Sequence, residues 1–240
     1  MTVKKSTVDE IRARFDADVE RFSNLETGQA VTIDSPLHME LLTEAAAAVT
    51  PQARSVLDIG CGAGNYTLKL LQRLPTLEVT LIDLSRPMLD RAVERIRQAA
   101  GREARAIQGD VREVDLGVER FDIVMAAQCL HHLRDEAEWR DVFARVYACL
   151  RPGGSFWISD SVEHELPAVQ QMVWRRWGEH LVDLKDAAYR DHVMAYVEKE
   201  DTPRPLTFQL DLLRQVGFAR VDVLHKHNRF ASFGGAKSSA

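Results

Sequence analysis

Short apolar segments alternate with longer amphipathic segments between Ser55 and Ser159, and this alternation limits the folds open to the chain. The apolar segments are typical of β-strands that are covered on both faces. We predict these strands at Ser55–Ile59, Glu78–Ile82, Ala104–Gln108, Phe121–Ala126 and Ser155–Ser159. Apolar residues at helical spacing predict intervening helices over Asn65–Leu74, Arg86–Ala100 and Glu136–Leu150. Repeated strand–helix–strand units predict an α/β fold with a doubly wound, mostly parallel sheet.

Helical patterns precede this core. Ile11, Phe15, Val19 and Phe22 form one apolar stripe at helical spacing, and His38–Val49 is an alanine-rich segment of the same type. We therefore predict a cap of helices over residues 1–50, ahead of a core that spans residues 51–161.

Behind the core, Glu163–Glu200 has no strand pattern and predicts a helical insertion, which we assign to residues 162–202. Leu206–Val216 predicts a further helix that ends at Gly217. Arg220–His225 and Arg229–Phe233 predict an antiparallel pair of strands because so short a connection joins them. We assign this last helix and the strand pair to residues 203–234, and we expect a frayed tail over residues 234–240.

Composition narrows the class of partner. The 240 residues carry a net charge of −5, and general binding to nucleic acid or to an anionic membrane needs a positive surplus. The chain lacks an apolar run of about 18 residues, so we expect no membrane span. The start, MTVKKSTVDEI, has no apolar stretch after its lysines and predicts no secretory signal. Scattered Cys61, Cys129 and Cys149 are typical of reduced thiols, which predicts a cytoplasmic protein.

A glycine-rich loop follows the first predicted strand. The segment Asp58–Asn65 contains Gly60, Gly62 and Gly64, which permit a sharp turn and a close approach of a ligand to the main chain. A ligand there lies beyond the carboxyl end of a strand, where open α/β sheets bind their ligands. The spacing differs from the dinucleotide fingerprint, because Asn65 stands beside the last glycine. A loop of this type alone can also be a plain turn.

Two carboxylates follow the next strands. Asp83 ends the second strand, 19 residues after Gly64, where a carboxylate can accept hydrogen bonds from ribose hydroxyls. Asp110 follows the third strand, where it can receive an adenine amino group. Taken singly, either residue can equally cap a strand–helix junction. A turn at Leu150–Gly154 (LRPGG) uses proline to stop a helix and glycine to shape the backbone.

These motifs, in this order, resemble the class I S-adenosylmethionine-dependent methyltransferases. The matching segments are VLDIGCGAGNYT (Val56–Thr67), LIDLSRPML (Leu81–Leu89), GD (Gly109–Asp110), FDIVMAAQCLHHL (Phe121–Leu133) and LRPGG. The resemblance covers about residues 50–160 and extends to the last two strands. It implies a Rossmann-like doubly wound sheet of seven strands, with only the last strand antiparallel.

The resemblance also implies which residues bind S-adenosylmethionine, the expected cofactor. They are Asp58, Gly60, Cys61 and Gly62 beside its methionine part, Asp83, Leu84 and Met88 beside its ribose and adenine, Asp110 and Val111 at the adenine edge, and Ala127 and Gln128 again at the methionine end. Asp58 either lies buried behind the loop or reaches the amino group of the cofactor through water.

Three residues near the expected methyl group are candidates for catalysis. His131 and His132 follow the fourth strand, and histidine can act as a base near neutral pH. The favoured alternative is that one of them packs and the other is solvated. Asp160 follows the fifth strand and either accepts a proton from the acceptor or caps the next helix. No metal set is expected, because adjacent histidines do not easily face one ion and no suitably spaced partner exists. His225-Lys226-His227, at the turn between the last strands, is expected to be solvated.

Aromatic residues mark the helical insertion. Trp174 and Trp177 share one helix face, and Arg175 and Arg176 flank them. They form either a lid over an acceptor pocket or a packed pair, and the N-terminal stripe is a second candidate for the lid. Stacking on a nucleotide base is a further alternative.

A second, more particular resemblance is to the carboxy-S-adenosylmethionine synthases, which serve tRNA wobble-uridine modification. It lies in VDEIRARFDADVERF, VMAYV, LLRQVGF and NRFASFGGAK. Ala187 and Ala127 stand where that family has an arginine and an asparagine, and Arg190 is the nearest substitute for the arginine. These departures favour plain S-adenosylmethionine.

The expected function is therefore transfer of a methyl group from S-adenosylmethionine to a small-molecule acceptor. Such an in-line displacement mainly requires positioning and the exclusion of water. Two alternatives stay open, namely synthesis of carboxy-S-adenosylmethionine and a non-catalytic role as a cofactor-binding partner subunit. The sequence is also compatible with a homodimer.

Overall fold

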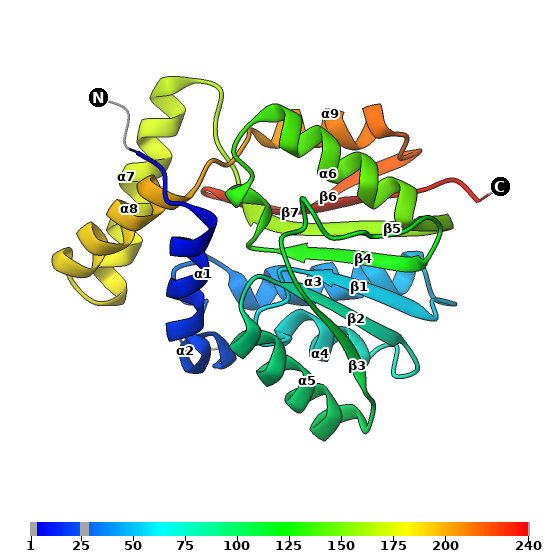
Figure 1. The fold of residues 1–240 in the computed structure, drawn as a ribbon. Coiled ribbons are helices and arrows are strands. Elements are labelled where there is room, and N and C mark those ends of the chain that lie inside the picture. The colour runs from blue at the N-terminus through cyan, green and yellow to red at the C-terminus, as the bar shows by residue number, and fades with distance from the viewer. Residues whose placement is uncertain (1–3, 25–28, 240) are drawn as a thin grey trace.

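A single sheet forms the centre of the molecule. The computed structural model describes residues 4–24 and 29–239, so the first three residues of the lysine-rich start lie outside the described part. In the described residues the sheet has seven strands in the order β3-β2-β1-β4-β5-β7-β6 (Figure 1). They are β1 (Ser55–Ile59), β2 (Glu78–Asp83), β3 (Ala104–Gln108), β4 (Phe121–Ala127), β5 (Leu150–Ser161), β6 (Arg220–His227) and β7 (Phe230–Ala236).

Strand direction confirms the predicted topology. Strands β1 to β5 pair in parallel, whereas β7 runs antiparallel to both β5 and β6. Asn228, with φ of 55°, forms the short turn before β7. The prediction of a frayed tail is wrong for its first three residues, because Gly234, Gly235 and Ala236 pair with β5. Strand β5 also begins earlier than predicted, since Leu150 pairs with Phe121 before a register shift.

Helices cover both faces of the sheet. They are α1 (Val8–Ala17), α2 (Val19–Ser23), α3 (Ser35–Val49), α4 (Asn65–Leu71), α5 (Arg86–Ala100), η1 (Leu130–His132, a 3-10 turn), α6 (Glu136–Cys149), α7 (Pro167–Leu184), α8 (Ala187–Glu200) and α9 (Leu206–Val216). The helical insertion is thus confirmed as α7 and α8. Within the described ranges, no helix combines the length and apolar character that a bilayer crossing requires.

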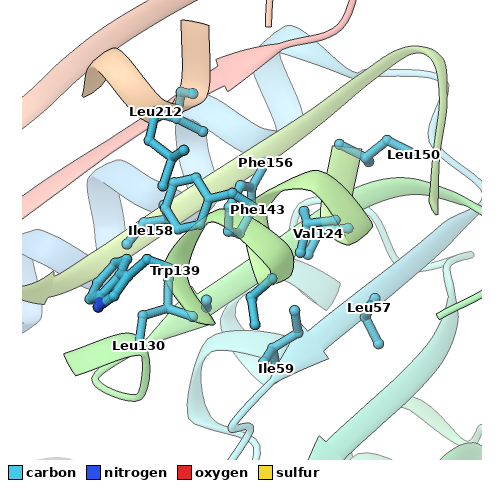
Figure 2. Packing of buried hydrophobic residues seen from close by; sticks show 14 of the residues in the cluster. Leu57, Ile59, Val124, Leu130, Trp139, Phe143, Leu150, Phe156, Ile158 and Leu212 are labelled. Carbon is cyan, nitrogen blue, oxygen red and sulfur yellow. The ribbon is translucent and has the colours of Figure 1, made fainter. Parts of the chain in front are cut away.

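Two hydrophobic cores lie on opposite faces of the sheet because strand side chains alternate. Leu57 of β1 belongs to the core beneath α6 and α9, which contains Trp139, Phe143 and Leu212 (Figure 2). Its neighbour Val56 belongs to the other core, beneath α3, α4 and α5. Burial on both faces fixes the register of the central strands and therefore fixes the loops at their carboxyl ends.

The N-terminal stripe forms two helices where one was expected. Thr7 and Glu10 make a capping box at the start of α1. Asp18 then leaves helical geometry, with φ of −111° and ψ of 15°, and α2 begins at the next residue. Helices α1, α2, α7 and α8 stand at the edge of the sheet toward which β4 points (Figure 1). The carboxyl ends of the parallel strands are therefore covered by helices.

Candidate active site

A cavity of about 230 Å³ lies at the carboxyl ends of β1, β2 and β4, beneath α1, α2, α7 and α8. All the residues that the sequence predicted to bind the cofactor line it: Asp58, Gly60, Cys61, Gly62, Asp83, Leu84, Met88, Asp110, Val111, Ala127 and Gln128. Of the catalytic candidates, His131 and His132 also line the cavity.

The glycine loop forms one wall of this cavity. Gly60 has φ of +63°, and a Cβ atom there would lie 2.5 Å from Cβ of Cys129. A Cβ atom on Gly62, with φ of +50°, would meet nothing within 4 Å. Gly60 is therefore required by packing, whereas Gly62 leaves open space for a ligand to approach the main chain.

Asp58 lies behind the loop and is almost fully buried. Its carboxylate accepts a hydrogen bond of 2.6 Å from Oγ1 of Thr67, the partner that α4 supplies. Burial raises the pKa of Asp58 to about 7. Asp58 is thus buried behind the loop, which is one of the two placements expected from the sequence. A cationic group in the cavity would favour its ionised form.

Asp83 connects the glycine loop to the end of β2. Its Oδ2 accepts a hydrogen bond of 2.8 Å from the backbone N–H of Gly62, and its Oδ1 accepts one of 2.8 Å from Ser85. Burial raises the pKa of Asp83 and outweighs these two hydrogen bonds. The carboxylate is thus fixed beside the loop, with lone pairs left for hydroxyl donors.

Asp110 has a partner that the sequence analysis did not foresee. Arg112 donates to both carboxylate oxygens, with Nε 2.9 Å from Oδ1 and Nη2 2.5 Å from Oδ2. Burial opposes the ionised form, but the hydrogen bonds from Arg112 prevail and lower the pKa of Asp110. An adenine amino group would therefore share an oxygen with this arginine.

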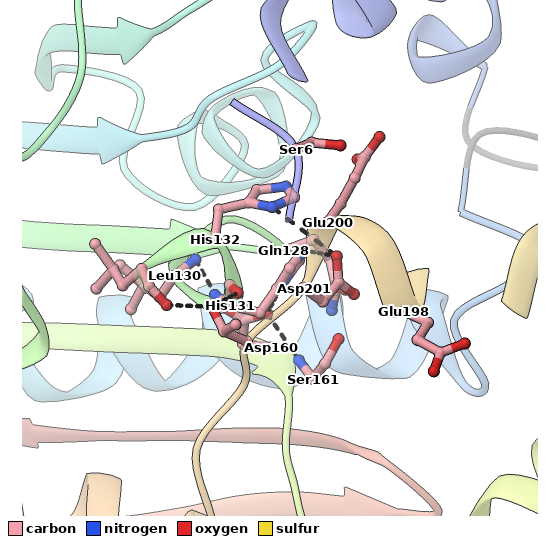
Figure 3. A network of polar contacts seen from close by, with 12 residues as sticks. Ser6, Gln128, Leu130, His131, His132, Asp160, Ser161, Glu198, Glu200 and Asp201 are labelled. Atoms are coloured by element: carbon pink, nitrogen blue, oxygen red, sulfur yellow. Dashed lines mark hydrogen bonds and ion pairs between the residues drawn. The ribbon is translucent and has the colours of Figure 1, made fainter. Parts of the chain in front are cut away.

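Asp160 lies behind His131, away from the cavity wall. It is 0% exposed, and its carboxylate accepts hydrogen bonds from the backbone N–H groups of Leu130, His131 and Ser161 at 2.8, 3.2 and 2.7 Å (Figure 3). Its Oδ1 also forms a short contact with Nδ1 of His131. Three of these four interactions hold the carboxylate against the 130–131 turn, and the described start of α7 has no side-chain cap, so the predicted helix cap is not formed.

His131 and His132 differ in protonation. Burial disfavours the charged form of His131, but Asp201 and Asp160 outweigh it and raise the pKa of His131 to about 9. Burial, with the nearby His131, lowers the pKa of His132 well below its usual value. Both nitrogens of His132 lack hydrogen-bond partners in the described part of the chain. The expected solvation of one histidine is not found, because both rings are mostly covered.

Arg229 is the principal site residue that sequence reasoning missed. It is 4% exposed, and its guanidinium carbon lies 4.8 and 4.5 Å from the ring centres of Trp174 and Trp177. Its Nη2 lies 3.7 Å from Oδ2 of Asp201, whereas Nη1 has no hydrogen-bond partner among the described residues. Arg229 also lines the cavity. The tryptophan pair therefore packs against a cavity-lining arginine of this chain. An arginine directly before the apolar strand FASF was the available signal.

The covering helices contact His132 and are joined to neighbouring segments by hydrogen bonds. The ring of Phe15 lies 6.0 Å from that of His132, edge to face. Asn65 donates a hydrogen bond of 2.9 Å from Nδ2 to the carbonyl of Phe22, which connects α4 to the end of α2. Trp177 is buried and donates from Nε1 to the carbonyl of Val31 at 2.9 Å. One tryptophan of the predicted lid is therefore also a fixed part of the core.

Comparison with known sequences identifies the family. Residues 56–154 match a methyltransferase domain. The chain is 32% identical, over 185 residues, to the carboxy-S-adenosyl-L-methionine synthase of Chromohalobacter salexigens, and the alignment covers 74% of this chain. The chain belongs to the class I S-adenosylmethionine-dependent methyltransferase superfamily. The alignment spans 66% of the length of that relative, just under two thirds.

Solved structures of this superfamily share the fold. An O-methyltransferase family protein from Burkholderia thailandensis matches with a TM-score of 0.67 at 20% identity, over 97% of this chain and 62% of that one. A 1,6-didemethyltoxoflavin-N1-methyltransferase from the same organism, solved with bound 1,6-didemethyltoxoflavin and S-adenosylhomocysteine, matches with a TM-score of 0.64 at 20% identity. That match covers 99% of this chain and 93% of the other, so the helical cap and the insertion also have counterparts in known folds.

Proposed function

We propose that this protein transfers a methyl group from S-adenosylmethionine to a small-molecule acceptor, in the cytoplasm. The observation that carries the proposal is the continuity of one cavity. It runs from the glycine loop and Asp83 to His131, His132 and Arg229, beneath helices that limit its size. The three cysteines are all free, which is consistent with a reducing compartment.

The residues at the loop end fit S-adenosylmethionine. Gly62 leaves open space, and the fixed carboxylate of Asp83 can accept hydrogen bonds from ribose hydroxyls. Leu84, Met88 and Val111 provide apolar surface for adenine. When bound, the cofactor supplies a methyl group on a positively charged sulfur, which is already activated for transfer.

The other end of the cavity holds groups that suit an acceptor. Neutral His132, whose ring nitrogens make no hydrogen bond within the described residues, can take a proton from a hydroxyl or an acidic carbon. The free Nη1 of Arg229 can donate a hydrogen bond to an acceptor oxygen. Asp201 lies within 3.7 Å of both Arg229 and His131, so it holds these two cations in place. Phe15 beside His132 excludes water from this corner.

Titration of S-adenosylmethionine into an Asp83→Asn variant tests the cofactor end. Loss of the charge should weaken binding by about 1.5–3 kcal/mol, roughly 10- to 150-fold in Kd, because hydrogen bonds to a charged acceptor are the stronger kind. Asp90→Asn is the matched control, since Asp90 is an exposed carboxylate of α5 that pairs with Arg86. Equal affinity of the two variants would mean that the loop binds a different ligand.

Synthesis of carboxy-S-adenosylmethionine is the second candidate, and Arg229 is the observation that favours it. A buried arginine with a free N–H can bind a carboxylate, a role for which sequence offered only Arg190. Arg190 instead donates to its neighbour Asp191 and is not among the residues that line the cavity. Mass spectrometry of ligand released from denatured protein separates the candidates. We expect S-adenosylmethionine or its demethylated product, and a predominant carboxylated form would favour the second.

A further inference from the structure

A second cluster of titratable side chains lies outside the cavity, between the start of α3 and strand β6. Oδ2 of Asp34 accepts hydrogen bonds from Nε2 of His225 at 2.9 Å and from Nδ1 of His227 at 2.7 Å. Each of these three residues offers one ligand atom, and the three atoms all lie within 4.8 Å of one another. No local pattern reveals this set, because Asp34 and His225 are 191 residues apart.

The pleat of β6 places both imidazoles on one face. His225 and His227 are two residues apart in the strand, so they point to the side of the sheet that α3 covers. Lys226 between them points the other way, and its Nζ lies 2.8 Å from Nε2 of His164. The lysine charge is therefore directed away from the cluster.

Asp34 is turned toward these histidines by the backbone. It precedes α3 as the N-cap residue, a position at which aspartate ordinarily accepts a hydrogen bond from the first turn. Here the side chain makes no such bond. Its carboxylate instead receives the two imidazoles, as a carboxylate ligand in a metal site would.

His38 supplies a second, independent observation beside the cluster. Its ring is fully buried and lies 4.9 Å from the ring of His225, with Nδ1 2.6 Å from Oγ of Ser232. Nε2 of His38 has no hydrogen-bond partner in the described ranges. Buried ring nitrogens are normally satisfied, so a group other than protein is expected there, such as an ordered or metal-bound water.

We propose that Asp34, His225 and His227 bind a divalent transition-metal ion of the zinc type. Two imidazole nitrogens and one carboxylate oxygen are ligands that Zn²⁺ prefers, and three protein ligands leave one position for water. The side chains are 35%, 24% and 53% exposed for Asp34, His225 and His227, so an ion can enter from solvent. Binding replaces the two hydrogen bonds to Asp34 with metal–ligand bonds.

The other cluster with suitable ligand atoms, His131, His132 and Asp201, is less suited to an ion. Nδ1 of His131 is engaged by Asp160, and the raised pKa of His131 keeps the ring protonated at neutral pH. Arg229 adds a positive charge 3.7 Å from Asp201. A cation would meet two positive groups there, whereas the described hydrogen bonds to the carboxylate of Asp34 come from His225 and His227 and from no arginine or lysine.

An ion at the Asp34 cluster would connect the sheet to the segment that precedes α3. Val31 and Thr32 of this segment line the cavity, and the carbonyl of Val31 accepts the hydrogen bond from Trp177. Metal binding would fix the end of this segment against β6. It should therefore raise the melting temperature, since an ion that binds only the folded state stabilises it.

Zinc titration of untagged, chelator-treated protein in competition with a chromophoric chelator tests the proposal. We expect one Zn²⁺ per chain, a rise in melting temperature with Zn²⁺, and a visible absorption band with Co²⁺ as the substitute ion. His225→Gln and His227→Gln should each weaken Zn²⁺ binding by at least ~10-fold and remove the rise in melting temperature. His192→Gln is the matched control, because His192 is an exposed histidine of α8.

Three outcomes would overturn the proposal. The first is wild-type protein that binds no Zn²⁺, and the second is His225→Gln and His227→Gln variants that bind it as the wild type does. The third is loss of Zn²⁺ only in His132→Gln, which would assign the ion to the other cluster. His227 is the most exposed of the ligands, so its variant is expected to fold and a loss of binding there reports the ligand itself.

Discussion

At the scale of single residues, His131 and His132 show how the fold separates two identical side chains. Asp160 and Asp201 stabilise the charged form of His131, whereas burial and the charge of His131 keep His132 neutral. Adjacent groups with opposite pKa shifts are typical of sites that assign one group to hold charge and the other to take a proton. We therefore propose that His131 holds charge and orients the site, and that His132 is the neutral group that can take a proton from an acceptor.

The raised pKa of His131 predicts a pH-dependent contribution to stability. A histidine with a folded-state pKa of about 9 stabilises the fold fully below its unfolded pKa of about 6.5. That contribution is lost as the pH rises through about 9. His131→Asn should thus lower the free energy of unfolding near pH 6 by on the order of 2–3 kcal/mol more than near pH 9.5. Urea unfolding at the two pH values measures this difference.

His192→Asn is the control for this measurement, because its exposed ring has no buried carboxylate partner among the described contacts. Its effect on the free energy of unfolding should be small and similar at both pH values. An effect of His131→Asn that is the same near pH 6 and near pH 9.5 would contradict the assignment of a charged His131.

At the scale of elements, we expect α1 and α2 to be the mobile part of the cover, which requires that the ion pair of Arg14 in α1 with Glu200 in α8 opens. Few side-chain contacts connect α2 to the core, chiefly Asn65 to the carbonyl of Phe22 and the ion pair of Arg91 with Glu20. In contrast, α7 contributes Trp177 and Leu181 to a buried cluster. We expect the two short helices to open for the ligand while α7 stays packed.

Hydrogen exchange with and without S-adenosylhomocysteine tests this division. Residues 8–23 should gain protection when the ligand binds, whereas the segment around Trp177 should change little. Asn65→Ala should speed exchange in residues 19–23 and weaken ligand binding several-fold, roughly the loss of one hydrogen bond of about 1 kcal/mol. Gln98→Ala, on the exposed side of α5, is the control. Equal protection of residues 8–23 in both states would mean that these helices are fixed.

The sequence could reveal site residues that directly follow a strand, but not those that the fold brings together from distant segments. The glycine loop, Asp83 and Asp110 were predictable because each directly follows a strand, and parallel strands bring their carboxyl ends to one edge. Arg229 and Asp201 were not, because no local pattern reports which distant side chains meet. Asp160 was located correctly at the edge, but only the structure shows that its carboxylate faces His131.

At the scale of the whole molecule, the sheet provides a constant cofactor end and the added helices shape the acceptor end. Helices α1, α2, α7 and α8 lie over the carboxyl edge of the sheet, and the cavity continues beneath them. A cavity covered in this way suits a small acceptor better than a macromolecule. We therefore propose methyl transfer to a small molecule within this cavity.

Transfer of a labelled methyl group tests that claim most directly. The protein is incubated with S-adenosylmethionine that carries an isotopic label in its methyl group, together with a cell extract that is afterwards separated by ultrafiltration. We predict that the label moves into a new small molecule in the filtrate, and that Asp83→Asn reduces this transfer while Asp90→Asn does not. Label in retained protein or nucleic acid, or no transfer although S-adenosylmethionine binds, would contradict the account.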